Sequence, residues 1–309
     1  MKILHIGITV NGRGEGLSEA FHDSNHDYKE LPVNDQLPTR LNALNWNPDL
    51  VFVQIQSEFA LKIINQINHL KKQGSFVINW TGDARNYVPL WMRKFPADVT
   101  TFSNMRDVRA FPNAQYLQIG FDPKTYKNWQ EPNHHDVVFM GNESAQFPLT
   151  PERKSMIAAI KSMSVNKMRV NFGLYGSYQG SITALNPDPQ NPFPIQSQES
   201  KIYAGSKIGI NYSHYNIERY TSDRMFRMLG SGIMVLSHYY EGIEDEFIIG
   251  EELDVFRTTH ELKSKIEYYL NNEEKRSEIA ANGYQIAHRF FTYKSMVQSI
   301  IKIYEKAKM

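Results

Sequence analysis

Short apolar runs alternate with longer amphipathic runs along most of the chain, a pattern typical of βα units around a mainly parallel sheet. In the first half, the spacing predicts strands over 3–9, 50–54, 76–80, 98–102 and 116–119. The clearest helix spans 58–73, where apolar side chains recur on one face and Gly74 follows as a stop signal. We therefore expect the first half to form one α/β sheet.

The second half repeats this pattern after a stretch, 122–136, that is rich in proline, asparagine and charge and indicates a linker. Strands are predicted over 137–140, 169–174, 207–212 and 232–237, and helices over 151–163, 261–270, 273–289 and 296–304. Residues 186–194 hold four prolines in nine positions and predict a surface loop. The fold class we expect is α/β with two doubly wound, Rossmann-like sheets.

The most informative segment is 220–237, YTSDRMFRMLGSGIMVLS, in which a polar turn precedes a short helix and an apolar strand. Ser222 or Asp223 is the expected N-cap, which leaves backbone N–H groups and the positive helix end at the turn. Such a helix start binds phosphate, and Arg224 adds a charge suited to a diphosphate. The alternative is a helix cap without a ligand.

Ligands of doubly wound sheets lie beyond the carboxyl ends of the strands. This rule predicts that several segments converge on one interdomain cleft: 7–16, 80–85, Gly141 with Asn142, Tyr175 with Gly176, Ser213, and 221–224.

The glycine-rich loop 11–16 follows the first predicted strand and contains Gly12, Arg13 and Gly14. Its glycine spacing differs from that of a dinucleotide fingerprint. Three interpretations therefore stay open: a loop that lets substrate or the other domain approach, a plain turn, and a dinucleotide site.

Trp80, Asp83 and Arg85 lie just past a predicted buried strand. A carboxylate at this position could deprotonate an acceptor hydroxyl. The alternative is an internal Asp83–Arg85 pair that closes a turn.

Two histidine groups, His22 with His26 and 134–136, have spacings that suit a metal. Both lie in polar stretches without an evident supporting residue, so we expect solvated surface and no metal. No P-loop, nucleophile elbow or Asp-x-Asp motif at a strand end is present, which argues against P-loop enzymes, serine hydrolases and single-sheet metal-dependent transferases.

Composition adds bounds to this interpretation. A chain of 309 residues, 41% of them hydrophobic, is long enough for two domains. The 34 basic and 33 acidic residues give no global charge argument for nucleic acid or an acidic membrane. Cysteine is absent, the N-terminus carries no signal-peptide pattern, and no apolar run approaches the ~20 residues of a membrane span, so we expect a soluble, cytoplasmic protein.

Four segments in order carry a family resemblance: Gly141-Asn142 after a strand, YAGSKIGINYSH (203–214), the 220–237 segment, and the terminal helices from 261 to 293. They resemble the C-terminal domain of GT-B glycosyltransferases, especially the CgeB-like group. In the N-terminal half the resemblance rests on element order and on YLQIGFDPKTY (116–126), which looks like a hinge-side turn of these enzymes.

The resemblance implies three parts: an acceptor-binding domain over 1–132, a nucleotide-sugar-binding domain over 133–290, and a C-terminal helix over 291–309 that packs back on the first domain. It implies a metal-independent transferase (EC 2.4) without a cofactor, which moves a sugar from a nucleotide-diphosphate sugar, with a UDP-sugar as the expected donor. The acceptor would be a hydroxyl-bearing glycan, small molecule, protein or modified DNA base, and nucleic acid enters only as an acceptor.

Site roles follow from the same resemblance. The diphosphate-binding turn corresponds to Ser222, Asp223 and Arg224, and the base-binding strand ends to Gly141, Asn142, Tyr175 and Gly176. Ser213, Tyr220 and Thr221 complete the expected donor site, and Gly12, Arg13, Gly14, Trp80, Asp83 and Arg85 form the expected acceptor side.

The chain departs from the family pattern at Arg227, where many relatives carry a glutamate that holds the donor ribose. Asp223, Glu218 or the acidic turn 241–245, which includes Glu244, would then replace that glutamate. A solvated loop is the alternative interpretation of the acidic turn.

The expected catalytic residues are Arg224, which would neutralise charge on the leaving diphosphate, and Asp83. Asp83 would accept the acceptor proton if the reaction inverts configuration and would position the acceptor if it retains it. A nucleotide-sugar epimerase and a catalytically silent binding protein of the same fold remain open as alternatives.

Overall fold

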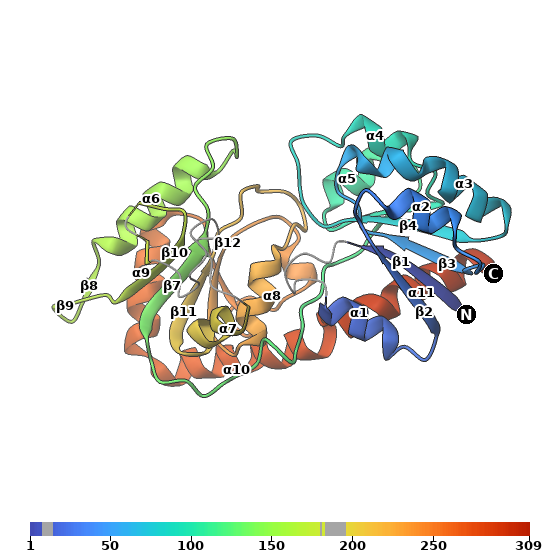
Figure 1. Cartoon of the computed structure of the whole chain (residues 1–309). Coiled ribbons are helices and arrows are strands. Elements are labelled where there is room, and N and C mark those ends of the chain that lie inside the picture. The colour runs from blue at the N-terminus through green and yellow to red at the C-terminus, as the bar shows by residue number, and fades with distance from the viewer. Residues whose placement is uncertain (8–14, 180, 183–195) are drawn as a thin grey trace. The chain divides into compact units, whose positions relative to one another are not determined.

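The computed structural model describes residues 1–7, 15–179, 181–182 and 196–309. The chain divides into two compact units, which we call the first unit (Met1–Gly120 with Tyr293–Met309) and the second unit (Phe121–Thr292). Figure 1 shows the elements of both units. The predicted 186–194 loop and most of the 11–16 loop lie outside the described residues.

The first unit is built on a six-stranded sheet in the order β2-β1-β3-β4-β5-β6, in which all neighbouring strands run parallel. The strands are β1 (Lys2–Gly7), β2 (Asp27–Pro32), β3 (Leu50–Val53), β4 (Phe76–Thr81), β5 (Val99–Phe102) and β6 (Ala114–Tyr116). The helices are α1 (Glu15–His22), α2 (Leu37–Asn42), the 3₁₀ helix η1 (Glu58–Ile63), α3 (Ile64–Lys72), α4 (Leu90–Lys94), α5 (Met105–Ala110) and α11 (Tyr293–Lys308).

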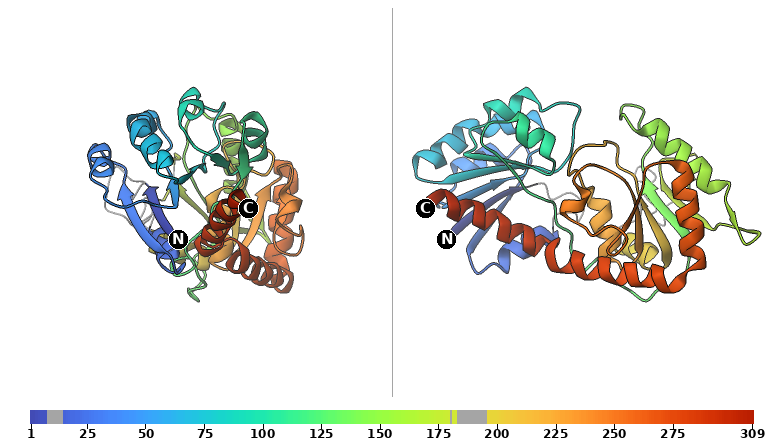
Figure 2. Two further views of the ribbon diagram at one scale, coloured as in Figure 1. Left: turned by 90° about the vertical axis from the view of Figure 1, so that its right-hand side faces the viewer. Right: turned by 180° about the vertical axis from the view of Figure 1, so that it is seen from behind.

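Both faces of this sheet are buried, because successive side chains of a strand point to opposite faces. In β3, Val51 and Val53 join the core beneath α2 and α3, whereas Leu50 and Phe52 join the core beneath α1 and α11. Figure 2 shows α11, in dark red, beside the blue strands of this sheet. The last helix of the chain therefore completes the core of the first unit.

The second unit is built on a five-stranded parallel sheet in the order β10-β7-β11-β12-β13. The strands are β7 (His135–Gly141), β10 (Phe172–Gly176), β11 (Ser206–Asn211), β12 (Met234–His238) and β13 (Asp254–Phe256), with an antiparallel ribbon of β8 (Ser164–Val165) and β9 (Met168–Arg169). The helices are α6 (Thr150–Lys161), α7 (Gln196–Ala204), α8 (Asp223–Gly230), the 3₁₀ helix η2 (Ile243–Asp245), α9 (Thr259–Asn271) and α10 (Glu273–Phe290). Helices α6 and α9 share one core with the sheet, to which Ile279 of α10 also belongs, and α8 and α10 both contact β12.

The boundary between the units differs from the predicted position at 132. Phe121 belongs to the second unit: its N–H donates to the carbonyl oxygen of Phe291 at 3.0 Å, and its ring contacts His288. Tyr126 is also buried, with its hydroxyl 3.4 Å from Glu199. Phe121 directly precedes the polar segment 122–136, and the polar composition of that segment concealed the buried Tyr126.

Several predicted elements differ in extent. The helix predicted over 58–73 begins as η1 before α3 continues it, and the strand predicted over 169–174 begins only at Phe172. The strand predicted over 3–9 is described only to Gly7. Strands β2 and β13 carried too weak an apolar pattern to be predicted, the first being DYKELP and the second three residues long.

Candidate functional site

The carboxyl edge of the second sheet gathers most of the predicted donor residues. Gly141 and Gly176 are register partners at the ends of β7 and β10, and Ser213 lies just past the end of β11. Helix α8 begins at the same edge, because Ser222 bonds to Asn211, the last residue of β11. The sheet thus brings together segments that lie far apart in the sequence.

The start of α8 lacks a side-chain cap. Ser222 is the N-cap residue, but its hydroxyl donates to Oδ1 of Asn211 at 2.8 Å instead of accepting from the helix. Asn211 in turn donates to Ser237 on β12 at 2.9 Å. The helix start is therefore fixed to two strand ends, while its positive dipole end remains available to an anion.

Two arginines and a histidine form a cationic cluster beside this helix start, which we call the Arg153 cluster (Arg153, His214 and Arg224). Arg153, on α6, is fully buried, and both it and Arg224 lie over the ring of Phe139, at 5.2 and 5.6 Å from the ring centroid. Burial and the charge of Arg224 lower the pKa of Arg153 to about 10. Within the described residues, neither guanidinium pairs with a carboxylate, so the cluster carries uncompensated positive charge.

Arg153 also has hydrogen-bonding capacity to spare. Its Nη1 contacts the ring nitrogens of His214 at 2.5 and 2.7 Å, whereas Nε and Nη2 have no partner among the described residues. A side chain at position 141 would collide with Nη2, which gives Gly141 a packing role in holding Arg153. The hydroxyl of Ser213 is likewise buried without a partner. Unpaired buried donors of this kind suit an anionic ligand.

His214 links the cluster to the predicted donor residue Asn142, since its Nε2 lies 2.6 Å from Oδ1 of Asn142. The ring of Phe147 packs on the imidazole at 4.0 Å between centroids. Burial, followed by the charges of Arg153 and Arg224, lowers the pKa of His214 to about 3. His214 is therefore a neutral imidazole at physiological pH.

The loop before α8 is held by a buried network. Thr221 contacts the hydroxyl of Tyr240 at 2.6 Å and donates to Glu246 at 2.7 Å. Arg219 has a positive φ of 52° and pairs with Asp245 and Glu246 at 3.6 and 3.7 Å. The acidic turn is thus tied to the loop that contains Tyr220, but Glu244 itself is solvent exposed.

Arg227 occupies the position where the resemblance implies a glutamate. It lies between Glu199 on α7, at 3.0 Å, and Asp223 one turn earlier on α8. These carboxylates raise the pKa of Arg227, although burial acts against them. Arg227 therefore joins α7 to α8, and Glu199, which sequence reasoning did not single out, is its buried partner.

Tyr175 differs from its predicted role in one respect. Its side chain is buried and its hydroxyl lies 2.9 Å from Nε2 of His135, at the start of β7. Gly176, which follows it, has a φ of 113° that suits glycine. The main chain of Tyr175 and Gly176 lies at the carboxyl edge of the sheet. The phenol of Tyr175 instead contacts His135, which lies at the other end of β7.

In the first unit, the predicted acceptor residues differ in burial, and some of them lie outside the described residues. Gly12, Arg13 and Gly14 lie outside the described residues. Trp80 is a core residue whose Nε1 donates to the Leu117 carbonyl oxygen at 3.4 Å, so its side chain faces away from solvent. Because its side chain is buried, Trp80 cannot contact an acceptor as predicted.

Asp83 and Arg85 follow the carboxyl end of β4. Asp83 is exposed, and Arg85 donates to the Gln56 carbonyl oxygen at 2.6 Å. Ser103 and Arg106 donate to the carbonyl oxygens of Gly82 and Arg85 at 2.6 and 2.5 Å. The loop that carries Asp83 is therefore anchored to neighbouring strand ends.

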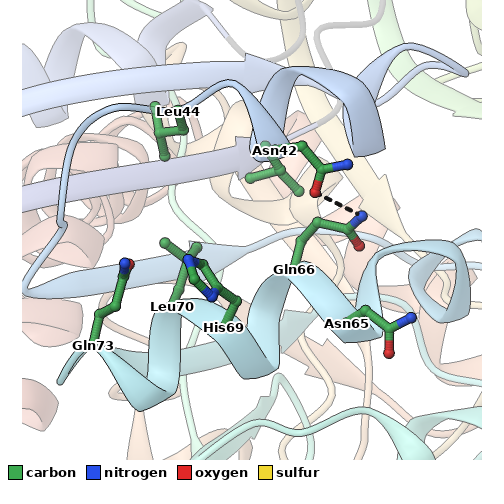
Figure 3. A pocket seen from close by; sticks show the side chains of 8 residues that line it. Asn42, Leu44, Asn65, Gln66, His69, Leu70 and Gln73 are labelled. Carbon is green, nitrogen blue, oxygen red and sulfur yellow. Dashed lines mark hydrogen bonds between the residues drawn. The ribbon is translucent and has the colours of Figure 1, made fainter.

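A pocket of about 290 Å³ lies between α2 and α3 of the first unit. Figure 3 shows amide side chains around it, with Gln66 donating to Asn42 at 3.2 Å. Leu70 and Gln73 line it shortly before β4 begins, whereas Asp83 follows the end of that strand. This pocket therefore belongs to the opposite edge of the sheet from Asp83.

Across the parts of the chain that the structure describes, no three histidine, aspartate or glutamate side chains are grouped to hold a metal ion. The described helices include none with the length and apolar character needed to span a membrane.

About half of the chain is similar to a known protein family. Residues 153–302 match a family model described as "Glycosyl transferase-like". No curated protein matches the chain. The matched segment contains the Arg153 cluster, α8, α9, α10 and the first part of α11.

Solved structures share the fold of the whole chain at low sequence identity. Anabaena HepE in complex with UDP-glucose is similar with a TM-score of 0.68 and 12% identity, covering 99% of this chain and 100% of that one. Sucrose-phosphate synthase from Thermosynechococcus elongatus gives 0.61 and 10%, with 99% of both chains covered. A glycosyltransferase from Rickettsia africae ESF-5 gives 0.61 and 9%, covering 99% of this chain and 98% of that one. Together, these comparisons show that residues 153–302 resemble a glycosyltransferase family and that the whole chain has the GT-B fold of these solved structures.

Proposed function

We propose that the chain is a metal-independent glycosyltransferase that binds a nucleotide-diphosphate sugar in the second unit and a hydroxyl-bearing acceptor on the first unit. The observation that carries this proposal is the Arg153 cluster, in which two guanidinium groups lie near the ring of Phe139 without a paired carboxylate among the described residues. Bringing like charges together in a buried place is unfavourable unless an anion compensates them. The uncapped start of α8 adds a second source of positive potential at the same edge.

We further propose that the donor is a UDP-sugar. Anabaena HepE, which has a similar fold, was solved in complex with UDP-glucose. At 12% identity this likeness supports the fold only, so the base and the sugar rest on the experiment below. The acceptor stays open among glycans, small molecules, proteins and modified DNA bases.

In the proposed reaction, the bond between the anomeric carbon and the diphosphate oxygen breaks, and the electron pair leaves with the diphosphate. Arg224 and the N–H groups at the start of α8 would stabilise the charge that develops there, and such preorganised groups contribute ~10²- to 10³-fold each to turnover. The acceptor oxygen attacks the anomeric carbon and loses its proton. Asp83, exposed at the end of β4, is the proposed group that receives this proton or positions the acceptor.

A thermal-shift panel of UDP, GDP, CDP and dTDP, each with and without a chelator, tests the donor site. A ligand that binds only the folded protein raises its melting temperature. We expect one nucleotide to stabilise the wild type without regard to chelator and to lose this effect in Arg224→Ala. Arg289→Ala, an exposed arginine on α10, is the matched control and should respond like the wild type.

The panel has two contrary outcomes. If none of the four nucleotides stabilises the wild type, the proposed donor site is wrong. If stabilisation requires a metal that the chelator removes, the metal-independent mechanism is wrong.

A further inference from the structure

The pocket between α2 and α3 of the first unit takes no part in the proposed transfer reaction. Its volume of about 290 Å³ is close to the lower limit for small-molecule sites. Five polar side chains line it, and we call it the amide pocket because four of them are amides: Asn42, Asn65, Gln66 and Gln73, together with the imidazole of His69. A side-chain amide both donates and accepts hydrogen bonds, so this lining offers a ligand both functions.

The amides of the pocket are only partly engaged with one another. Nε2 of Gln66 donates to Oδ1 of Asn42 at 3.2 Å, which ties α3 to α2. Figure 3 shows these two side chains directed toward each other, with Gln73 farther along α3. Oε1 of Gln66 is buried without a partner among the described residues, and in the same part of the chain the side-chain amide of Gln73 has none. Hydrogen-bonding capacity therefore remains for a ligand.

The rest of the lining is apolar. Leu41 and Leu70 are core residues, 6% and 4% exposed, and Leu44 is half-buried. Of the described residues that line the pocket, none is an aspartate, glutamate, lysine or arginine. An ionised ligand would find no carboxylate, ammonium or guanidinium there to compensate for the hydration that it loses. The pocket therefore suits a small neutral ligand with both apolar and hydrogen-bonding surface.

A sugar ring has these properties, because its hydroxyl groups donate and accept hydrogen bonds while its C–H groups present apolar surface. We propose that the amide pocket binds one neutral sugar residue of a carbohydrate. This site is separate from Asp83, since Leu70 and Gln73 precede the start of β4 and Asp83 follows its end. The inference goes beyond the proposed function, because a sugar can bind here whether or not transfer takes place.

NMR of the ¹⁵N-labelled protein tests the ligand class. Glucose, maltose, cellobiose and lactose are the neutral probes, and glucuronate and glucosamine add a negative and a positive charge to the glucose ring. We expect at least one neutral probe to shift the side-chain amide signals of Gln66 and Gln73, and both charged probes to bind more weakly than glucose.

Two variants test the position of the sugar. Gln66→Met and Gln73→Met retain the length of the side chain and remove its amide, so each should weaken binding about threefold to tenfold, the range for a neutral hydrogen bond. Gln73 is exposed, so its replacement leaves the core intact. Asn68→Leu removes an exposed amide of α3 that does not line the pocket, and this control should bind like the wild type.

The absence of shifts with every neutral probe would overturn the proposal, as would equal binding of glucose and its charged counterparts. Unchanged affinity in both methionine variants would place the sugar elsewhere, and a loss of binding in Asp83→Asn would place it at the proposed acceptor position. None of these measurements uses a nucleotide, so failure here is distinguishable from failure of the nucleotide panel.

Discussion

Arg224 is directed by its neighbours on α8. Asp223, which precedes it, forms an ion pair with Arg227 one turn later on the same helix. Glu199 holds Arg227 from α7 and fixes that geometry. Arg224 instead lies over Phe139 with the charge of Arg153 nearby. The two arginines of one short helix thus serve different ends: Arg227 neutralises carboxylates, and Arg224 contributes positive charge to the candidate site.

At the residue scale, the role proposed for Asp83 can be separated from donor binding. Asp83→Asn keeps the size of the side chain but removes its basicity, so sugar transfer should fall ~10²- to 10⁴-fold, as for loss of a general base. UDP affinity should be unchanged, because Asp83 lies in the first unit. Release of UDP from a UDP-sugar with hydroxyl acceptors measures the first quantity, and calorimetry the second.

Asp35→Asn, at an exposed aspartate of the same unit, is the control for the Asp83 variant. If Asp83→Asn transfers sugar at the wild-type rate, Asp83 is not the group that receives the proton. A binding protein without catalytic activity would transfer no sugar in the wild type, in Asp83→Asn or in Asp35→Asn.

At the scale of elements, α10 holds the loop before β13 against α8. Gly283 lies where α10 approaches the main chain of Glu252. A Cβ there would overlap the Glu252 carbonyl oxygen and lie 2.8 Å from Cδ2 of Leu229. The glycine is therefore required by close approach of a main chain, since helix propensity by itself would favour alanine.

Gly283→Ala should consequently lower the free energy of unfolding by about 1–3 kcal/mol, the range for overpacking. In an open helix the same change would raise stability by about 1 kcal/mol. Urea unfolding followed by circular dichroism measures the difference, with Gln285→Ala on the exposed side of α10 as control. A stabilised Gly283→Ala protein would show that the contact with Glu252 relaxes at little cost.

At the scale of the molecule, each unit contains histidines that are buried or half-buried. Burial lowers the pKa of His5 in β1, of His135 in β7 and of His238 in β12, as well as that of His214. His5 is fixed by Tyr28 and Gln54, at 3.1 and 3.3 Å from its ring nitrogens. Both units therefore fold with these imidazoles neutral.

The sign of the pH dependence follows from these shifts. A histidine with a lowered pKa in the folded protein binds fewer protons than in the unfolded chain, where its pKa is about 6.5. Stability should therefore fall as pH drops below about 6.5, and for His214 the loss continues to about pH 3. Melting temperatures from pH 7.5 to 4.5 measure this decline, which should be shallower in His214→Gln. A melting temperature that rises on acidification would contradict the buried neutral state.

The sequence by itself determined the two parallel α/β units, because alternating apolar runs and amphipathic helices leave few other ways to bury apolar surface. It also indicated the start of α8 and Arg224, since N-cap residues, charge and helix lie within one short segment. Strands without a strong apolar pattern, such as β2, and the boundary at Phe121 could not be predicted in this way. Their positions depend on pairing with distant segments.

Only the tertiary structure revealed the buried side of the candidate site. Arg153, Glu199 and His214 belong to no local motif. Each has its role through partners on other elements: Arg153 lies by Arg224 and Phe139, Glu199 pairs with Arg227, and His214 contacts Asn142. Trp80 shows the reverse, because a residue at a strand end that the sequence assigned to the acceptor side points into the core. Spacing along a chain predicts elements, whereas the direction of a side chain and the charge it meets are decided by packing between elements.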